Sequence, residues 1–292
     1  MHCVITADGT FENRCDREAA EEEDTMRFLQ LSDLHFRKEY IQAESGYLSV
    51  FKHMTSPLTQ LERLLHEDTL RQIDFALVCG DLTERGTPED YPRLKMRLDR
   101  VFEGIPYLAV PGNHDDSTLF RKVWYGNRAD QYTFGTSSVF NDVLVVAMDN
   151  SSPDTPDGLI TQRHADWLRE KFEDASGCRR RILMMHHPLV FDPRVPVPTV
   201  SRTETFDALL DRYHPDMILC GHTHNYRICT YRHLLHVTCD GLSFRGSTHA
   251  DGNVTFREHA GLNKVLMDDT SIRVERVTVP GEEKILARAR MA

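Results

Sequence analysis

The chain has 292 residues, enough for one large α/β domain or for two small domains. Its 40% of hydrophobic and 27% of charged residues are typical of a globular protein and exclude a disordered or fibrous one. The formal net charge of −10 argues against a nucleic-acid polymer as partner, because an acidic surface repels a polyphosphate backbone. Small phosphate esters stay open as substrates, since bound metal ions can supply local positive charge.

The cysteine pattern and the lack of long apolar stretches point to a cytoplasmic setting. The seven cysteines form no C-x-x-C pair and are odd in number, so reduced thiols fit better than a disulfide framework. No apolar stretch approaches the length that spans a bilayer, and no membrane partner is expected.

The first 25 residues differ in character from the rest of the chain. They include the acidic run 21–24 and are expected to be a flexible extension, unless translation naturally begins at Met26. From Met26 onward no linker-like stretch interrupts the pattern. We therefore expect a single domain over residues 26–280, followed by a C-terminal tail at 281–292.

Apolar runs alternate with helical patterns along this domain, which indicates an α/β fold. The runs suit strands buried on both faces, and they lie at 28–31, 75–79, 107–110, 143–148, 182–185 and 217–220. Helices are predicted from Pro57, from Thr87 to about Phe102 with Pro88 in the first helical position, from Thr161 and from Thr203. Beyond His224, strands are predicted around 226–239, 253–258, 264–267 and 271–279, as antiparallel sheet completing the same domain.

Polar motifs follow five of these apolar runs, each at the carboxyl end of a predicted strand. They are Asp33-Leu34-His35, Gly80-Asp81, Gly112-Asn113-His114-Asp115, His186-His187-Pro188 and Gly221-His222-Thr223-His224. Ligands of open α/β sheets bind at the carboxyl ends of strands, so the five motifs are expected to converge on one rim. Side chains two apart on an extended segment point the same way, so Asp33 with His35, and His222 with His224, are predicted to act as forked pairs.

The residue types in these motifs favour metal chemistry. Carboxylates together with imidazoles suit Zn, Fe, Mn or Co, and the ligands outnumber the needs of one tetrahedral ion, so two metals are predicted. Two metals about 3.5–4 Å apart can hold a hydroxide that attacks a phosphoryl group and can stabilise the leaving oxygen. His114, next to Asn113, is the candidate proton donor for the leaving alkoxide.

With these motifs the chain resembles the calcineurin-like metallophosphoesterases, over residues 26 to about 245. The resemblance implies a four-layer α/β/β/α sandwich of two mixed sheets flanked by helices. It also implies that Asp33, His35 and His224 hold one metal, that Asp81 bridges both, and that His114 is a general acid or orients phosphate. The second metal would be held by Asn113, His186 and His222. The family pattern His-x-Pro assigns the ligand to His186 and leaves His187 either behind the ligands, where it would support them, or at the rim of the site.

One departure and one further likeness concern the segment after Asp81. Where protein Ser/Thr phosphatases of this superfamily have a second Asp that orients the catalytic histidine, this chain has Glu84. A position behind the site, supporting its side chains, and an ordinary surface position are both open for Glu84. The stretch 86–91 resembles the bacterial cyclic-nucleotide and glycerophosphodiester phosphodiesterases, which implies a small phosphodiester substrate.

Two other functions remain open at this point: a phosphomonoesterase acting on nucleotides or sugar phosphates, and a non-catalytic interaction scaffold on the same fold. Scaffolds of this kind typically lose the proton donor or several ligands, and here the whole set is present. The metal identity, the oligomeric state and the roles of the loops 36–56 and 191–202 are left undecided by the sequence.

Overall fold

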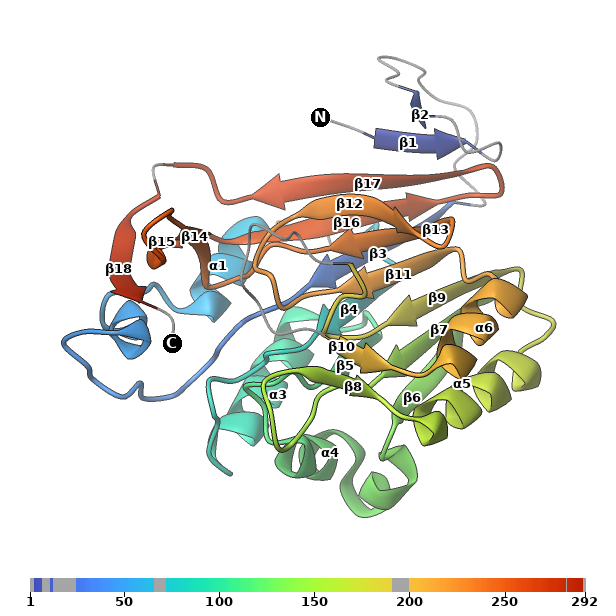
Figure 1. Cartoon of the computed structure of the whole chain (residues 1–292), viewed down its shortest axis with the longest axis horizontal. Helices are drawn as coiled ribbons and strands as arrows, with labels where there is room; N and C mark the ends of the chain where they lie inside the picture. Colours follow the sequence, from blue (N-terminus) through green and yellow to red (C-terminus); the bar gives the residue numbers. More distant parts are fainter. Residues whose placement is uncertain are drawn as a thin grey trace.

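The computed structural model describes residues 3–6, 11–12, 25–65, 72–190, 200–281 and 283–290. Two large mixed β-sheets pack face to face, and helices cover their outer faces (Figure 1). The expected four-layer α/β/β/α arrangement is therefore confirmed. Of the N-terminal segment 1–25, only two short strands and Thr25 are described, and the rest lies outside the described residues, as does the loop portion 191–199.

The first sheet has the order β2-β1-β17-β16-β3-β4-β5. Its parallel centre consists of β3, β4 and β5, and the strands on the other side are antiparallel. The strands are β1 (Cys3–Thr6), β2 (Phe11–Glu12), β3 (Met26–Leu31), β4 (Phe75–Cys79), β5 (Tyr107–Val110), β16 (Gly261–Met267) and β17 (Ser271–Thr278).

The second sheet has the order β12-β13-β11-β9-β7-β6, with four parallel strands between two antiparallel edges. Its strands are β6 (Gly135–Phe140), β7 (Val143–Met148), β9 (Arg180–Met184), β11 (Met217–Cys220), β12 (Arg227–Tyr231) and β13 (Leu234–Thr238). A short parallel pair, β8 (Gly158–Ile160) with β10 (Val200–Arg202), lies beside it.

Three apolar cores hold these layers together. The middle core lies between the sheets and contains buried side chains such as Phe75, Val145 and Leu219. One outer core packs α1 (Pro57–Leu64), α3 (Asp90–Val101) and α4 (Ser117–Tyr125) on the first sheet. The other packs α5 (Gln162–Asp174) and α6 (Glu204–Tyr213) on the second sheet. Strands buried on both faces explain the continuous apolar runs in the sequence.

A smaller unit packs at one end of the molecule. It combines the antiparallel strands β14 (Phe244–Thr248), β15 (Asn253–Glu258) and β18 (Ile285–Arg290) with the 3₁₀ helix η1 (Tyr47–Lys52). The helix η1 belongs to the long loop 36–56, which therefore packs into a core that it shares with these three strands. Strand β18 lies in the segment 281–292 that was expected to be a tail.

Two helices differ from the sequence prediction. Helix α3 begins at Asp90 and not at Pro88, because the Asp90 carboxylate accepts hydrogen bonds from the backbone nitrogens of Thr87 and Lys38 and holds residues 88–89 in a turn. Helix α4 was not predicted, although Asp116 caps it by accepting from Thr118 N and Leu119 N. The helix starts predicted at Thr161 and Thr203 are confirmed, and each threonine is the N-cap of its helix.

A buried amide crosses the middle core. Gln30 on β3 donates through Nε2 to the carbonyl of Cys220 on β11 at 2.9 Å and accepts from Asn263 Nδ2 at 2.9 Å. Gln30 is fully buried, so these polar partners have no access to water. The amide therefore joins the two sheets by hydrogen bonds within an apolar layer.

Replacing Gln30 with leucine is expected to destabilise the protein, because it leaves the buried amide of Asn263 without its acceptor and removes one of the two donors to the Cys220 carbonyl. We expect a loss of about 1–3 kcal/mol in the free energy of unfolding, measured by urea denaturation. Leu29→Met on the same strand changes little volume and no polar group, and serves as the control. An unchanged urea midpoint in Gln30→Leu would show that the amide contributes nothing to stability.

Candidate metal centre

The five motif-bearing loops meet at one rim, and the backbones of three of them adopt an unusual conformation there. Positive φ angles occur at Asp33 (55°), His35 (48°), Asp81 (47°), His222 (69°) and His224 (51°). This left-handed region is strained for residues other than glycine, and such strain gathers at functional sites. The forked-pair argument is therefore wrong in its premise, since these residues are not on extended segments.

Glycine is required where the loops approach most closely. Gly80 has φ 89°, and a Cβ atom there would collide with the His186 ring. A Cβ atom on Gly112 would collide with Asp81. Both glycines thus allow neighbouring loops to bring their side chains together.

Four side chains form the first group of metal-ligand type: Asp33, His35, Asp81 and His224. The Nε2 atoms of His35 and His224 lie 3.1 Å apart. His224 Nε2 is 3.4 Å from Asp33 Oδ1, and His35 Nε2 is 3.6 Å from Asp81 Oδ2. All four side chains are buried or nearly so.

A second group surrounds the other side of Asp81. His186 Nε2 lies 3.3 Å from Asp81 Oδ2 and 3.2 Å from Asn113 Oδ1. The same Asp81 oxygen thus lies between His35 and His186. The pair His222 and His224, predicted as a fork, is divided between the two groups, since His222 clusters with His186 and His187.

The hydrogen bonds of these histidines show which ring nitrogen of each faces the centre. The second ring nitrogens of His186 and His224 face backbone carbonyls, of Cys79 and Phe244, at 2.7 Å, so each must donate there. In their neutral forms both rings then turn an unshared pair on Nε2 towards carboxylate or amide oxygens. Such a collection of acceptors fits a cation, and the residues present therefore suit bound metal ions.

The pKa shifts of these histidines also favour bound cations. Burial works against a charge on His186, but the Asp81 carboxylate outweighs it and raises the pKa of His186 to about 9. Burial and the adjacent His187 lower the pKa of His222 well below its usual value. The position between Asp81 and His186 thus favours positive charge, whereas His222 is held neutral and can ligate metal.

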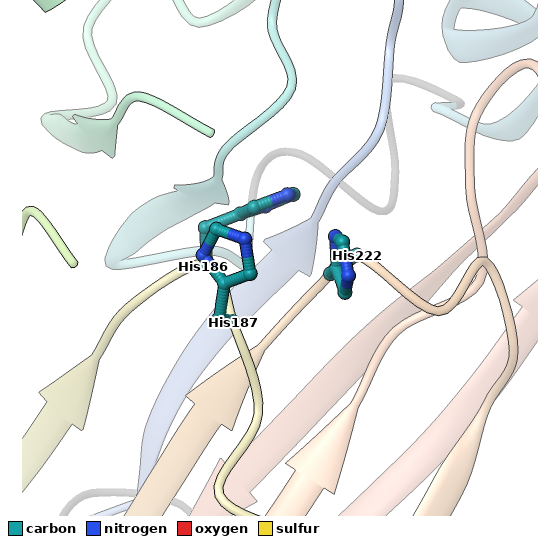
Figure 2. Close-up of side chains that lie close together, drawn as sticks. All are labelled: His186, His187 and His222. Atoms are coloured by element: carbon teal, nitrogen blue, oxygen red, sulfur yellow. The ribbon is translucent and has the colours of Figure 1, made fainter. Parts of the chain in front are cut away.

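Figure 2 shows His186 and His187 on one loop, with His222 beside them. His187 is fully buried, so it is not a rim residue. Its Nε2 lies 2.9 Å from the carbonyl of Pro156, and burial together with His186 lowers its pKa to about 3. His186, not His187, contacts Asp81 and Asn113.

Glu84 is buried beside the first group, with 4% of its surface exposed, and three side chains contact it. Its Oε2 atom lies 2.8 Å from His35 Nδ1 and 2.9 Å from His114 Nδ1, and it accepts from the Tyr47 hydroxyl at 3.1 Å. Among the described residues His114 Nδ1 has no hydrogen-bond partner, so its attraction to Glu84 is that of an ion pair. Burial would raise the pKa of Glu84, but His114 and His35 outweigh it and hold it below its usual range. The surface alternative for Glu84 is thus wrong.

Two residues that sequence reasoning missed also shape the site. Asp115 accepts from the backbone nitrogens of Leu82, Thr83 and Gly112 and so ties two motif loops together. Tyr47 comes from η1 in the loop 36–56 and reaches Glu84. Asp115 stood inside a recognised motif, whereas no local signal in the sequence marks Tyr47.

This fold and this group of acid, amide and imidazole side chains define a metallophosphoesterase. The sequence model of the calcineurin-like phosphoesterases matches residues 26–226, and the chain belongs to that family. It is therefore a phosphoric ester hydrolase of a metal-dependent family.

Comparison with individual proteins supports the same class. A glycerophosphodiester phosphodiesterase of Enterobacter lignolyticus is 26% identical over 216 residues, covering 71% of this chain and 74% of the relative. The 3′,5′-cyclic adenosine monophosphate phosphodiesterase of Escherichia coli is 24% identical, with 68% and 70% covered. A purple acid phosphatase of yellow lupin has a TM-score of 0.57 at 15% identity, covering 88% of this chain and 52% of that one, which shows a shared fold. No helix in the described part of the chain is long and apolar enough to cross a membrane.

Proposed function

We propose that the protein is a two-metal phosphodiesterase acting on small diesters of the cyclic-nucleotide or glycerophosphodiester class. The observation that carries this proposal is the collection of hydrogen-bond acceptors around Asp81, which fits two cations on either side of one carboxylate. The names of the relatives in Enterobacter lignolyticus and Escherichia coli support a diester over a monoester.

The ligands are proposed from the two groups described above. Asp33, His35 and His224 would hold one ion, and Asp81 would bridge to the other. Asn113, His186 and His222 would complete the second position. Carboxylate, amide and imidazole together suit Mn, Fe, Zn or Co. Two bound metals would supply Lewis acidity and lower the pKa of a water nucleophile.

His114 is the proposed proton donor to the leaving alkoxide. Burial lowers its pKa, but the carboxylates of Asp81 and Glu84 outweigh burial and raise it to about 9. Glu84 lies against Nδ1, so Nε2 is the nitrogen that can give a proton to a substrate. Tyr47 donates to the same Glu84 oxygen that faces His114, and this contact would hold Glu84 in place beside the ring.

Removing metal is expected to abolish turnover. Purified protein treated with a chelator should lose hydrolysis of bis(p-nitrophenyl) phosphate and should recover it when Mn(II) is restored. Metal analysis should return two ions per active chain. Activity that persists after the metal content has fallen to background would contradict the proposal. Faster turnover of p-nitrophenyl phosphate than of the diester would favour a phosphomonoesterase.

A further inference from the structure

A cavity of about 690 Å³ opens beside Asn113 and His114. Its volume suits a small organic group, since ligand pockets commonly enclose about 300–1,000 Å³. The walls come from α4, from the loop after β7 and from the start of α5. His114, the proposed proton donor, lines this cavity, so the alcohol half of a diester is the part that would enter it.

The cavity wall is joined to the metal centre through Asn150. Its side-chain oxygen accepts from the backbone nitrogens of His186 and His187 at 3.2 and 3.1 Å, and its amide donates to the His187 carbonyl at 3.0 Å. Asn150 is fully buried. The adjacent residue Asp149 is therefore held at a set position relative to the histidine loop.

Asp149 is a buried carboxyl group at the cavity wall, with 6% of its surface exposed. Its Oδ1 atom accepts from the backbone nitrogen and the hydroxyl of Ser151, at 3.0 and 2.6 Å. Its Oδ2 atom lies 3.7 Å from Arg121 Nη1, longer than a hydrogen bond. Burial raises the pKa of Asp149. Asp149 and Arg121 thus form a long ion pair without a hydrogen bond. Both residues line the cavity, where a ligand can contact them.

A hydroxyl group matches this pair, because it can donate to a carboxylate and accept from a guanidinium at the same time. Ser117 Oγ and Ser151 Oγ, 3.1 Å apart, offer a place for a second hydroxyl. Carboxylates in nucleotide-binding proteins recognise ribose hydroxyls by the same chemistry. An apolar alcohol would offer no hydrogen bond to Asp149 Oδ2 or to Arg121 in place of the water that it displaces.

We propose that this cavity receives the alcohol half of the substrate and that Asp149, Arg121 and Ser151 recognise its hydroxyl groups. The preferred substrates are then diesters of a small polyol, with glycerol and ribose as the two sources of that chemistry. This inference rests on the proposed diesterase function and makes Asp149 a specificity-determining residue.

The test compares matched substrate pairs in the Mn(II)-loaded protein. Methyl glyceryl phosphate is paired with methyl propyl phosphate, and 3′,5′-cyclic AMP with its 2′-deoxy analogue, with products followed by phosphorus NMR. Within at least one pair, kcat/KM should be at least about tenfold higher for the hydroxylated member. The pair that shows the preference identifies glycerol or ribose as the source. Equal turnover within both pairs overturns the inference.

Asp149→Asn should bring the ratio of kcat/KM within the preferred pair close to one. A ratio within one variant does not depend on how much of the protein is folded, so a folding defect cannot imitate this result. Asp154→Asn, an exposed carboxylate on the same loop, is the control and should keep the wild-type ratio. An unchanged ratio in Asp149→Asn overturns the inference while leaving the diesterase function intact. Absence of any diester hydrolysis by wild-type protein, bis(p-nitrophenyl) phosphate included, overturns both.

Discussion

Asp81→Ala is expected to reduce kcat/KM for bis(p-nitrophenyl) phosphate by at least about 10³-fold. Asp81 Oδ2 lies between His35 and His186, so its removal takes away the carboxylate shared by both proposed metal positions. Several kcal/mol of charge stabilisation in the transition state depend on that arrangement, and each 1.36 kcal/mol is a factor of ten. Metal content, measured by mass spectrometry, should fall below two ions per chain.

A second variant separates charge from structure at this position. Asp81 Oδ1 also accepts from the backbone nitrogen of His114 at 2.8 Å, and Asp81→Asn keeps an oxygen for that bond. It should nevertheless lose activity, because an uncharged amide does not neutralise the positive charge of two cations. Asp154→Ala on an exposed loop removes a carboxylate elsewhere and should behave as wild type. Full activity in Asp81→Asn would refute the bridging role.

His114→Ala is expected to lower kcat by about 10²–10⁴-fold while metal content stays at the wild-type level. The ring belongs to neither proposed ligand group, and its Nδ1 faces Glu84. A loss of proton donation should be smaller for bis(p-nitrophenyl) phosphate than for an alkyl diester, because p-nitrophenolate leaves without a proton.

The comparison of leaving groups is the decisive measurement for His114. An equal loss on both substrates would indicate that the ring orients phosphate and does not donate a proton. Loss of metal from His114→Ala would show that the ring is a ligand. His249→Ala, in the turn between β14 and β15, removes an exposed imidazole and is the control for nonspecific effects.

Much of the fold follows from local pattern. The strands β4, β5, β7 and β11 begin and end where the apolar runs do. Strands that are buried on both faces consist of apolar residues throughout, so the first polar residue marks the end of the strand. Helix α3 starts later than its sequence signal, since the carboxylate of Asp90 is also bound by Lys38, which is distant in sequence. Contacts of this kind have no local signature.

The candidate site divides in the same way. The motifs named the side chains that converge on Asp81, because their residue types and their positions after strands are local properties. Left-handed backbone at Asp33 or His222 could not be predicted, since those angles are imposed by packing between loops. Tyr47 and Asp149 were missed for a related reason, because each makes its contact at the site with a partner far along the chain.

The strained loops around Asp33 and His224 have a consequence for how the protein matures. Each left-handed residue of this kind raises the free energy of the folded chain by about 1–3 kcal/mol unless neighbouring interactions compensate. Cations bound among the crowded acceptors would supply that compensation. Metal availability in the cell would then govern how much of the newly made chain reaches a durable folded form, so that starvation for metal would reduce the abundance of the protein as well as its turnover.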